Sequence, residues 1–206
     1  MAKKIDVVSN VRVYDLEESL IASGYPMRTD AGEMGYDPQV TEKDVKRGIK
    51  LSKLSTESAN GAHEQFLTGI LVSFDLTFSI KAWVEAERYR FLSFVSSEST
   101  MHRIMKFDIA EQCNEYVDPA IIELVKDWIN EYNCEGDPER KKELYLHVLY
   151  NIPNGFRLTA RMTTNYRCLK NIYRQRKDHR LPEWREFCKW IETLPYAKEL
   201  ITLQGE

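Results

Sequence analysis

The chain has 206 residues, of which 43% are hydrophobic and 30% are charged, and its formal net charge at pH 7 is −3. This length predicts a single domain over residues 1–206 with one substantial core. The acidic balance argues against a surface that follows nucleic acid, and no stretch is long and apolar enough to span a membrane. Because the start also lacks the apolar core of a signal peptide, we expect a soluble, cytoplasmic protein.

The N-terminal part of the chain mixes strand and helix patterns. Residues 5–14 are rich in β-branched side chains, which is typical of a strand. Residues 24–40 hold several glycines and prolines and predict a long irregular loop, which in a compact domain is usually functional or mobile. A helix is predicted from Thr41 to about residue 59, and the alternation of apolar and polar residues over 72–79 predicts a half-buried strand.

The later part of the chain is mainly helical. Asp followed by Pro at two places is typical of a capped helix N-terminus. The predicted elements, in chain order, are a helix over 80–90, helices from Asp118-Pro119 and from Asp137-Pro138 to before Pro153, a strand over 156–163, and helices over 165–178 and from Pro182. Strands with clean alternation among about five helices predict an α+β fold, with helices packed on a mostly antiparallel sheet.

The four cysteines, Cys113, Cys134, Cys168 and Cys188, lie about twenty or more residues apart. A disulfide framework or a structural zinc site needs closer grouping in a chain of this kind. We therefore expect reduced thiols, partly buried, and no metal site.

Three segments carry side chains suited to binding anions. His63 follows a turn at Asn60-Gly61, which is also compatible with an ordinary loop histidine. The sequence Arg88-Tyr89-Arg90 precedes a hydroxyl-rich loop, and guanidinium groups suit phosphate or carboxylate, although an ion-paired helix end has the same composition. Residues 163–176 predict a basic helix opening after two threonines, where backbone amides favour anions. An exposed basic helix is the plainer alternative there, and the acidic overall balance disfavours RNA binding.

Taken in order, these features resemble the flavin-dependent thymidylate synthase family. The resemblance rests on His63, a strand, Arg88-Tyr89-Arg90, Pro153, then Asn165-x-Arg167-x-Leu169-x-Asn171 and Arg176. It runs from about residue 60 to residue 191, and more weakly over residues 11–23. It implies the α+β fold of the thymidylate synthase-complementing proteins.

The resemblance also implies an activity. Family members are homotetramers that bind FAD and convert dUMP to dTMP, with methylenetetrahydrofolate as carbon donor, NADPH as reductant and no attacking cysteine. Arg176 would be the catalytic residue, stabilising negative charge as the uracil N3 loses its proton. The implied FAD contacts are His63, Arg88, Tyr89, Arg90, Asn165, Arg167 and Asn171, and the implied nucleotide contacts are Glu85, Arg88, Glu98, Ser99, Thr100 and Arg176.

The chain departs from the family pattern on the nucleotide side. Tyr89 replaces the histidine of the family's Arg-His-Arg, Glu85 replaces a glutamine, and Leu149 replaces an arginine. A two-residue insertion would align Glu98 and Thr100 with the family's Glu-x-Ser. These differences leave two alternatives to dUMP methylation. The first is methylation or hydroxymethylation of another pyrimidine nucleotide, UMP or dCMP. The second is a non-catalytic protein that binds flavin or nucleotide.

Overall fold

The computed structural model describes residues 6–29, 39–57 and 63–203, which fall into two compact units. Each unit combines three separate segments of chain, and the prediction of one domain over residues 1–206 stays a prediction. Unit 1 comprises Met1–Ser9, Asp75–Arg88 and Phe94–Arg161, and unit 2 comprises Asn10–Phe74, Tyr89–Ser93 and Met162–Glu206.

The strands are hydrogen-bonded into one four-stranded antiparallel sheet, so the predicted α+β class is confirmed. The two strands with clean alternation are the neighbours at its centre, because an alternating pattern supplies one face for packing. In the sheet order β1-β2-β4-β3, the strands are β1 (Val8–Tyr14), β2 (Leu71–Ser79), β4 (Arg157–Asn165) and β3 (Ser93–Ser97).

Strand β3 was not predicted; its residues were assigned to a hydroxyl-rich loop. All five of its residues are exposed, and it lies at an edge of the sheet. An exposed edge strand has no buried face, so the alternation that identifies β2 and β4 is missing from its sequence. The loop assignment was therefore wrong for residues 93–97.

The helices that the sequence predicts begin close to where it places them, whereas α1, α4 and α5 were not predicted. The Asp118 and Asp137 side chains accept hydrogen bonds from backbone amides at the starts of α6 and α7, each of which opens with proline. The helices and single helical turns are α1 (Leu16–Ala22), η1 (Tyr25–Met27), α2 (Glu42–Glu57), η2 (Gln65–Thr68), α3 (Ile80–Ala86), α4 (Thr100–Arg103), η3 (Ile104–Lys106), α5 (Ile109–Gln112), α6 (Pro119–Cys134), α7 (Pro138–Asn151), α8 (Tyr166–Arg176), α9 (Pro182–Ile191) and η4 (Lys198–Thr202).

Two predictions fall partly outside the described residues. Most of the loop predicted over 24–40 lies there, as does the Asn60-Gly61 turn that was expected to end α2. None of the helices in the described ranges combines the length and hydrophobicity that crossing a bilayer requires.

The predicted helix over 80–90 ends early, because α3 stops at Ala86. Its last four residues do not continue the helix, and the Leu92 amide closes a turn onto the Tyr89 carbonyl at 2.9 Å. Tyr89 is buried at 6% exposure while Arg88 and Arg90 are exposed. The predicted helix rested on the apolar face of Ile80, Trp83, Val84 and Ala86, which ends where α3 ends, so its extension over residues 88–90 was wrong.

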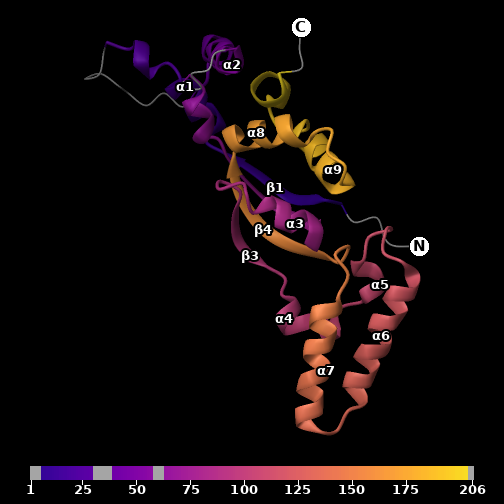
Figure 1. Ribbon diagram of the computed structural model, residues 1–206. Coiled ribbons are helices and arrows are strands. Elements are labelled where there is room, and N and C mark those ends of the chain that lie inside the picture. Colours follow the sequence, from indigo (N-terminus) through magenta and orange to yellow (C-terminus); the bar gives the residue numbers. More distant parts are fainter. Residues whose placement is uncertain (1–5, 30–38, 58–62, 204–206) are drawn as a thin grey trace. The chain divides into compact units, whose positions relative to one another are not determined.

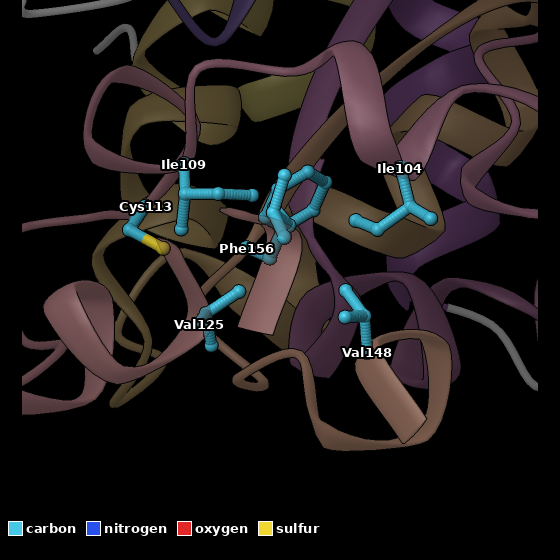
Figure 2. Packing of buried hydrophobic residues seen from close by; sticks show 7 residues of the cluster. Ile104, Ile109, Cys113, Val125, Val148 and Phe156 are labelled. Carbon is cyan, nitrogen blue, oxygen red and sulfur yellow. The ribbon is translucent and has the colours of Figure 1, made fainter. Parts of the chain in front are cut away.

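Unit 1 has a core built around its helical hairpin. Helices α6 and α7 lie side by side (Figure 1), and their buried residues form one cluster with residues of α5 and with Phe156, which directly precedes β4. Phe156 stands among aliphatic side chains in Figure 2, and Phe107 packs edge-on against it at 5.4 Å between ring centroids. The buried cluster consists of Ile104, Ile109, Cys113, Val125, Ile129, Val148 and Phe156.

Unit 2 has an aromatic core that fixes helix α8. Helices α8 and α9 pack against each other, and η4 packs on α8. Phe74 of β2 contacts Trp190 and Phe187 of α9 at ring-centroid distances of 4.7 and 5.8 Å. Trp184 is completely buried. Since α8 carries Arg167 and Asn171 of the predicted flavin residues and Arg176 of the predicted nucleotide residues, this core determines how they are presented.

Candidate functional site

Helix α8 starts with its first amides already engaged. The Asn165 side chain accepts a hydrogen bond from the Cys168 amide at 2.9 Å, and the Tyr166 amide donates to the Ile70 carbonyl at 3.1 Å. Such bonds satisfy donors that an anion would otherwise use. Asn165 therefore acts as the helix cap, and the outward side chains of α8 are the better candidates for a ligand.

Helix α8 has a buried face and an exposed face. Leu169 and Ile172 are fully buried, whereas Asn171 is exposed and Arg167 retains 37% of its side-chain exposure. Arg167 and Asn171 are four residues apart, so their side chains lie on one face of the helix. Asn171 accepts hydrogen bonds from side chains of the next turn, including that of Gln175 at 3.1 Å.

A carboxylate and an amide orient the cations of the first turn of α8. Arg167 donates to Gln65 Oε1 at 2.6 Å, and its Nε lies 3.4 Å from Glu64 Oε1. Lys170 donates to Glu64 Oε2 at 2.8 Å and to the Ser52 carbonyl at 2.7 Å. Glu64 therefore ties Arg167 and Lys170 to the turn that carries His63, which is itself exposed.

Arg176 occupies a different environment at the end of α8. It is buried, at 5% exposure. Its Nε donates to the Tyr89 hydroxyl at 2.7 Å, and its Nη1 lies 2.7 Å from His179 Nε2. The guanidinium carbon lies 4.8 Å from the centre of the Trp184 ring, which is a cation–π contact.

The Tyr89 hydroxyl contacts two successive residues of α8, Gln175 and Arg176. Its hydroxyl is 3.0 Å from Gln175 Oε1, and its ring meets that of Trp184 edge-on at 5.7 Å. The neighbouring Arg90 is exposed, with its guanidinium 5.9 Å from the Phe91 ring centre. The segment Arg88-Tyr89-Arg90 therefore places one buried side chain between two exposed arginines.

The cysteines of this region are poor nucleophiles. Burial raises the pKa of the Cys168 thiol, against the opposing hydrogen bonds from Thr164 and the Phe91 backbone. Burial also raises the pKa of Cys188 to about 12. Because the thiolate is the reactive form, neither group favours attack on a pyrimidine ring. All four cysteines of the chain are free, and two are buried, as predicted.

Unit 1 carries the remaining predicted nucleotide residues. Glu85 forms an ion pair with Lys81 at 3.3 Å within α3. Arg88 is exposed in the turn after α3. The Glu98 amide donates to the Thr159 carbonyl at 2.9 Å, and Glu98 Oε2 accepts from the Thr159 amide at 2.7 Å. The Glu98 carboxylate therefore extends the pairing of β3 with β4.

Ser99 and Thr100 lie where the chain passes from β3 into a short helix. Ser99 is the residue before α4, and its side chain makes no capping hydrogen bond. Thr100 is the first residue of α4. Both are partly exposed, so their hydroxyl groups are accessible to a ligand.

The fold matches solved structures, although no family model and no curated protein sequence matches the chain. A flavin-dependent thymidylate synthase from Helicobacter pylori, complexed with FAD and dUMP, superposes with a TM-score of 0.66 at 15% identity, covering 96% of this chain and 100% of that one. A second Helicobacter pylori structure with FAD and dUMP gives a TM-score of 0.64 at 16% identity, covering 95% of each chain.

A third match is the UMP/dUMP methylase PolB from Streptomyces cacaoi, bound with 5-Br dUMP. Its TM-score is 0.57 at 14% identity, and the match covers 98% of both chains. The chain therefore has the fold of the flavin-dependent thymidylate synthases. The resemblance drawn from the sequence is confirmed at the level of the fold.

In this fold, Glu64 and His179 contact predicted site residues, although the sequence assigned no role to either of them. Glu64 holds Arg167, and His179 contacts Arg176. A carboxylate directly after His63 was the available signal for Glu64, because a basic helix that binds anions needs its own counter-charge when it is partly buried. His179 had no such signal, because it lies in an irregular segment between α8 and α9.

Proposed function

We propose that the protein is a flavin-dependent enzyme that methylates C5 of a uracil nucleotide, with dUMP as substrate and dTMP as product. The observation that carries this proposal is the full-length match to thymidylate synthase folds with FAD and dUMP bound. It is supported by the presence of Arg167, Asn171 and Arg176 on one helix of this fold, with Asn165 as its N-cap.

FAD fits the donors that α8 and its neighbours present. Arg90, Arg167 and Asn171 offer cationic and amide groups at exposed or half-exposed positions of unit 2. These groups suit a pyrophosphate and ring carbonyls. We assign FAD binding to these residues together with His63, Arg88, Tyr89 and Asn165. When bound and reduced by NADPH, the flavin would supply the two electrons that turn a transferred methylene group into methyl.

Arg176 supplies the chemistry on the nucleotide. A guanidinium beside the uracil ring stabilises the negative charge left when N3 loses its proton, which makes C5 more nucleophilic. Arginine suits this role because it stays cationic even when buried. A carbon–carbon bond would then form between C5 and the methylene carbon while the bond from that carbon to the folate nitrogen breaks, and the C5 hydrogen would leave as a proton.

The other reactants are those that the family resemblance implies. Methylenetetrahydrofolate supplies the methylene carbon, and NADPH supplies the hydride that restores the reduced cofactor. We assign the nucleotide phosphate to Arg88 and to the hydroxyl groups of Ser99 and Thr100, with Glu85 and Glu98 nearby in sequence. We further propose that the protein assembles as a homotetramer.

The second candidate acceptor is UMP. Tyr89 and Glu85 depart from the family pattern on the nucleotide side, and the similar fold of PolB belongs to a methylase of both UMP and dUMP. Methylation or hydroxymethylation of dCMP and a non-catalytic binding role are the remaining outcomes to separate.

The test begins with purified protein reconstituted with FAD and supplied with NADPH and methylenetetrahydrofolate. We expect tritium release from C5-labelled dUMP above that from C5-labelled UMP or dCMP. Bound FAD without release from dUMP excludes the dUMP assignment, and release from UMP or dCMP alone identifies the acceptor. No NADPH oxidation with any nucleotide indicates a binding protein.

Thermal shift measures binding without turnover. A nucleotide at one hundred times its dissociation constant stabilises the folded state by about 2.7 kcal/mol. A shift with dUMP and none with UMP or dCMP supports dUMP as the ligand. Equal shifts with UMP favour the second candidate.

A further inference from the structure

The guanidinium of Arg176 is held by a cation–π contact and by hydrogen bonds. Its central carbon lies 4.8 Å from the centre of the Trp184 ring. Its Nε donates to the Tyr89 hydroxyl and its Nη1 lies beside His179 Nε2, both at 2.7 Å. Because these contacts hold two different nitrogens, they restrict the rotation of the group before a ligand binds.

The hydroxyl of Tyr89 has one arrangement of its proton in this network. Arginine only donates, so the Tyr89 oxygen accepts from Arg176 Nε. The hydroxyl proton is then directed to Gln175 Oε1, 3.0 Å away. The phenol therefore accepts from a charged donor and donates to an amide, and both bonds are lost in phenylalanine.

We propose that Tyr89 is a positioning residue, whose hydroxyl fixes the rotation of the Arg176 guanidinium that the pyrimidine ring meets. This inference rests on the proposed function, in which Arg176 faces that ring. It gives Tyr89 an action on the nucleotide that passes through Arg176. Small errors in the placement of a charged group are costly to a reaction, and a displacement of about 1 Å can lower a rate by about 100-fold.

A direct readout is the protonation of N3 in the bound nucleotide. Protein with bound FAD, but without folate or reductant, is mixed with dUMP labelled with nitrogen-15 at N3 and titrated with base. The nitrogen chemical shift then gives the N3 pKa on the protein. In the wild type we expect this pKa to be lower than in free dUMP, because Arg176 stabilises the anion.

Tyr89→Phe keeps the ring contact with Trp184 and removes only the hydroxyl. We expect it to weaken N3 ionisation by about tenfold, a rise of about one unit in the N3 pKa. The kcat for tritium release should fall by about 10- to 100-fold, with a much smaller change in nucleotide affinity. The matched control is Tyr173→Phe, which removes another buried hydroxyl of unit 2 that donates to Glu192 at 2.7 Å.

Each outcome decides between the two hypotheses. An N3 pKa in the wild type equal to that of free dUMP overturns the role of Arg176 in the proposed function. A lowered N3 pKa that Tyr89→Phe leaves unchanged overturns the positioning role alone, as does an equal rise in Tyr173→Phe.

If Tyr89→Phe does not fold, the exposed Gln175 carries the test. Gln175→Ala removes the acceptor of the Tyr89 proton and leaves the buried side chains in place. We expect a change in the same direction, smaller than tenfold. No change in the N3 pKa of Gln175→Ala overturns the inference.

Discussion

Arg176 and Arg90 carry the same charge in opposite surroundings. Arg176 is 5% exposed and is held by Tyr89, His179 and Trp184. Arg90 is exposed on a turn, beside the Phe91 ring. A side chain of this length loses roughly 1.5–2 kcal/mol of conformational free energy when it is ordered. Arg176 loses this conformational freedom when the protein folds, whereas Arg90 loses it only when a ligand binds.

The difference suits the two residues to different tasks. A group oriented before the ligand arrives can stabilise a charge that develops during the reaction, because no reorganisation is needed then. A mobile exposed cation suits a phosphate, which accepts hydrogen bonds from several directions. Burial therefore distinguishes the proposed catalytic arginine from the proposed binding arginine.

The largest expected effect is on Arg176 itself. Arg176→Lys keeps a cation but removes the planar fork, and a buried lysine loses its proton more readily than arginine. We expect tritium release from dUMP to fall by about 100-fold or more, because a directed charge is lost at the reacting ring. The rate should also acquire a new dependence on pH, falling as the pH rises and the lysine becomes neutral.

Arg174→Lys is the control, since Arg174 is an exposed arginine of the same helix. Its rate should match the wild type. If Arg176→Lys retains the wild-type rate while folded, the distinction between the two kinds of arginine fails.

The next effect concerns the exposed arginine. Arg90→Ala should weaken FAD binding by about tenfold, because a hydrogen bond to a charged group contributes about 1.5–3 kcal/mol and the exposed site recovers part of it from water. The melting temperature without FAD should not change. Titration of apoprotein with FAD measures the affinity, and the exposed Arg12→Ala is the control.

A loss of stability without loss of FAD affinity would show that Arg90 supports the fold instead. Raising the salt concentration should reduce the difference between Arg90→Ala and the wild type. Exposed charges are screened over a Debye length of about 8 Å at physiological ionic strength.

The parts of the fold that the sequence predicted are those set by neighbouring residues. Asp118 and Asp137 identify helix starts because an aspartate before proline caps its own helix. The alternation in β2 and β4 identifies central strands because each needs a packing face. These signals lie within a few residues, so one sequence is enough to read them.

The contacts that organise the candidate site depend on the tertiary fold. Arg176 and Tyr89 are 87 residues apart, and Lys170 and Glu64 are 106 apart. A pattern among neighbouring residues cannot identify pairs that lie so far apart in the sequence. The family resemblance identified Arg176 and Tyr89 as site residues. It did not indicate that the two side chains are in contact or that Tyr89 is buried.

A smaller effect is expected from the ion pairs of α8. Glu64 and Lys170 keep only 15% and 13% of their side-chain exposure, whereas the pair of Lys189 with Glu186 is largely exposed. Glu64→Gln removes the charge that partly buried cations share. We expect it to lower the free energy of unfolding by about 1 kcal/mol. Glu186→Gln should change it by less than half of that amount, because exposed pairs contribute little.

Denaturant unfolding of the two variants measures the contrast. Equal effects of Glu64→Gln and Glu186→Gln would mean that burial does not strengthen the α8 pairs. A stabilised Glu64→Gln variant would mean that desolvation of the pair exceeds its attraction.

The smallest expected effect is the difference between a buried cysteine and an exposed one. Burial raises the pKa of Cys113 to about 11, against an opposing attraction from Arg157, and Cys134 is exposed at the end of α6. At pH 8 we expect iodoacetamide to label Cys134 in the native protein and Cys113 only after unfolding, because thiolate and access are both needed. Since folding raises the pKa of Cys113, its neutral thiol favours the native state below about pH 9, and this contribution is lost as the pH rises toward 11. Peptide mapping by mass spectrometry locates the label. Equal labelling of Cys113 and Cys134 in folded protein would contradict the packing of the unit 1 core around Phe156 (Figure 2).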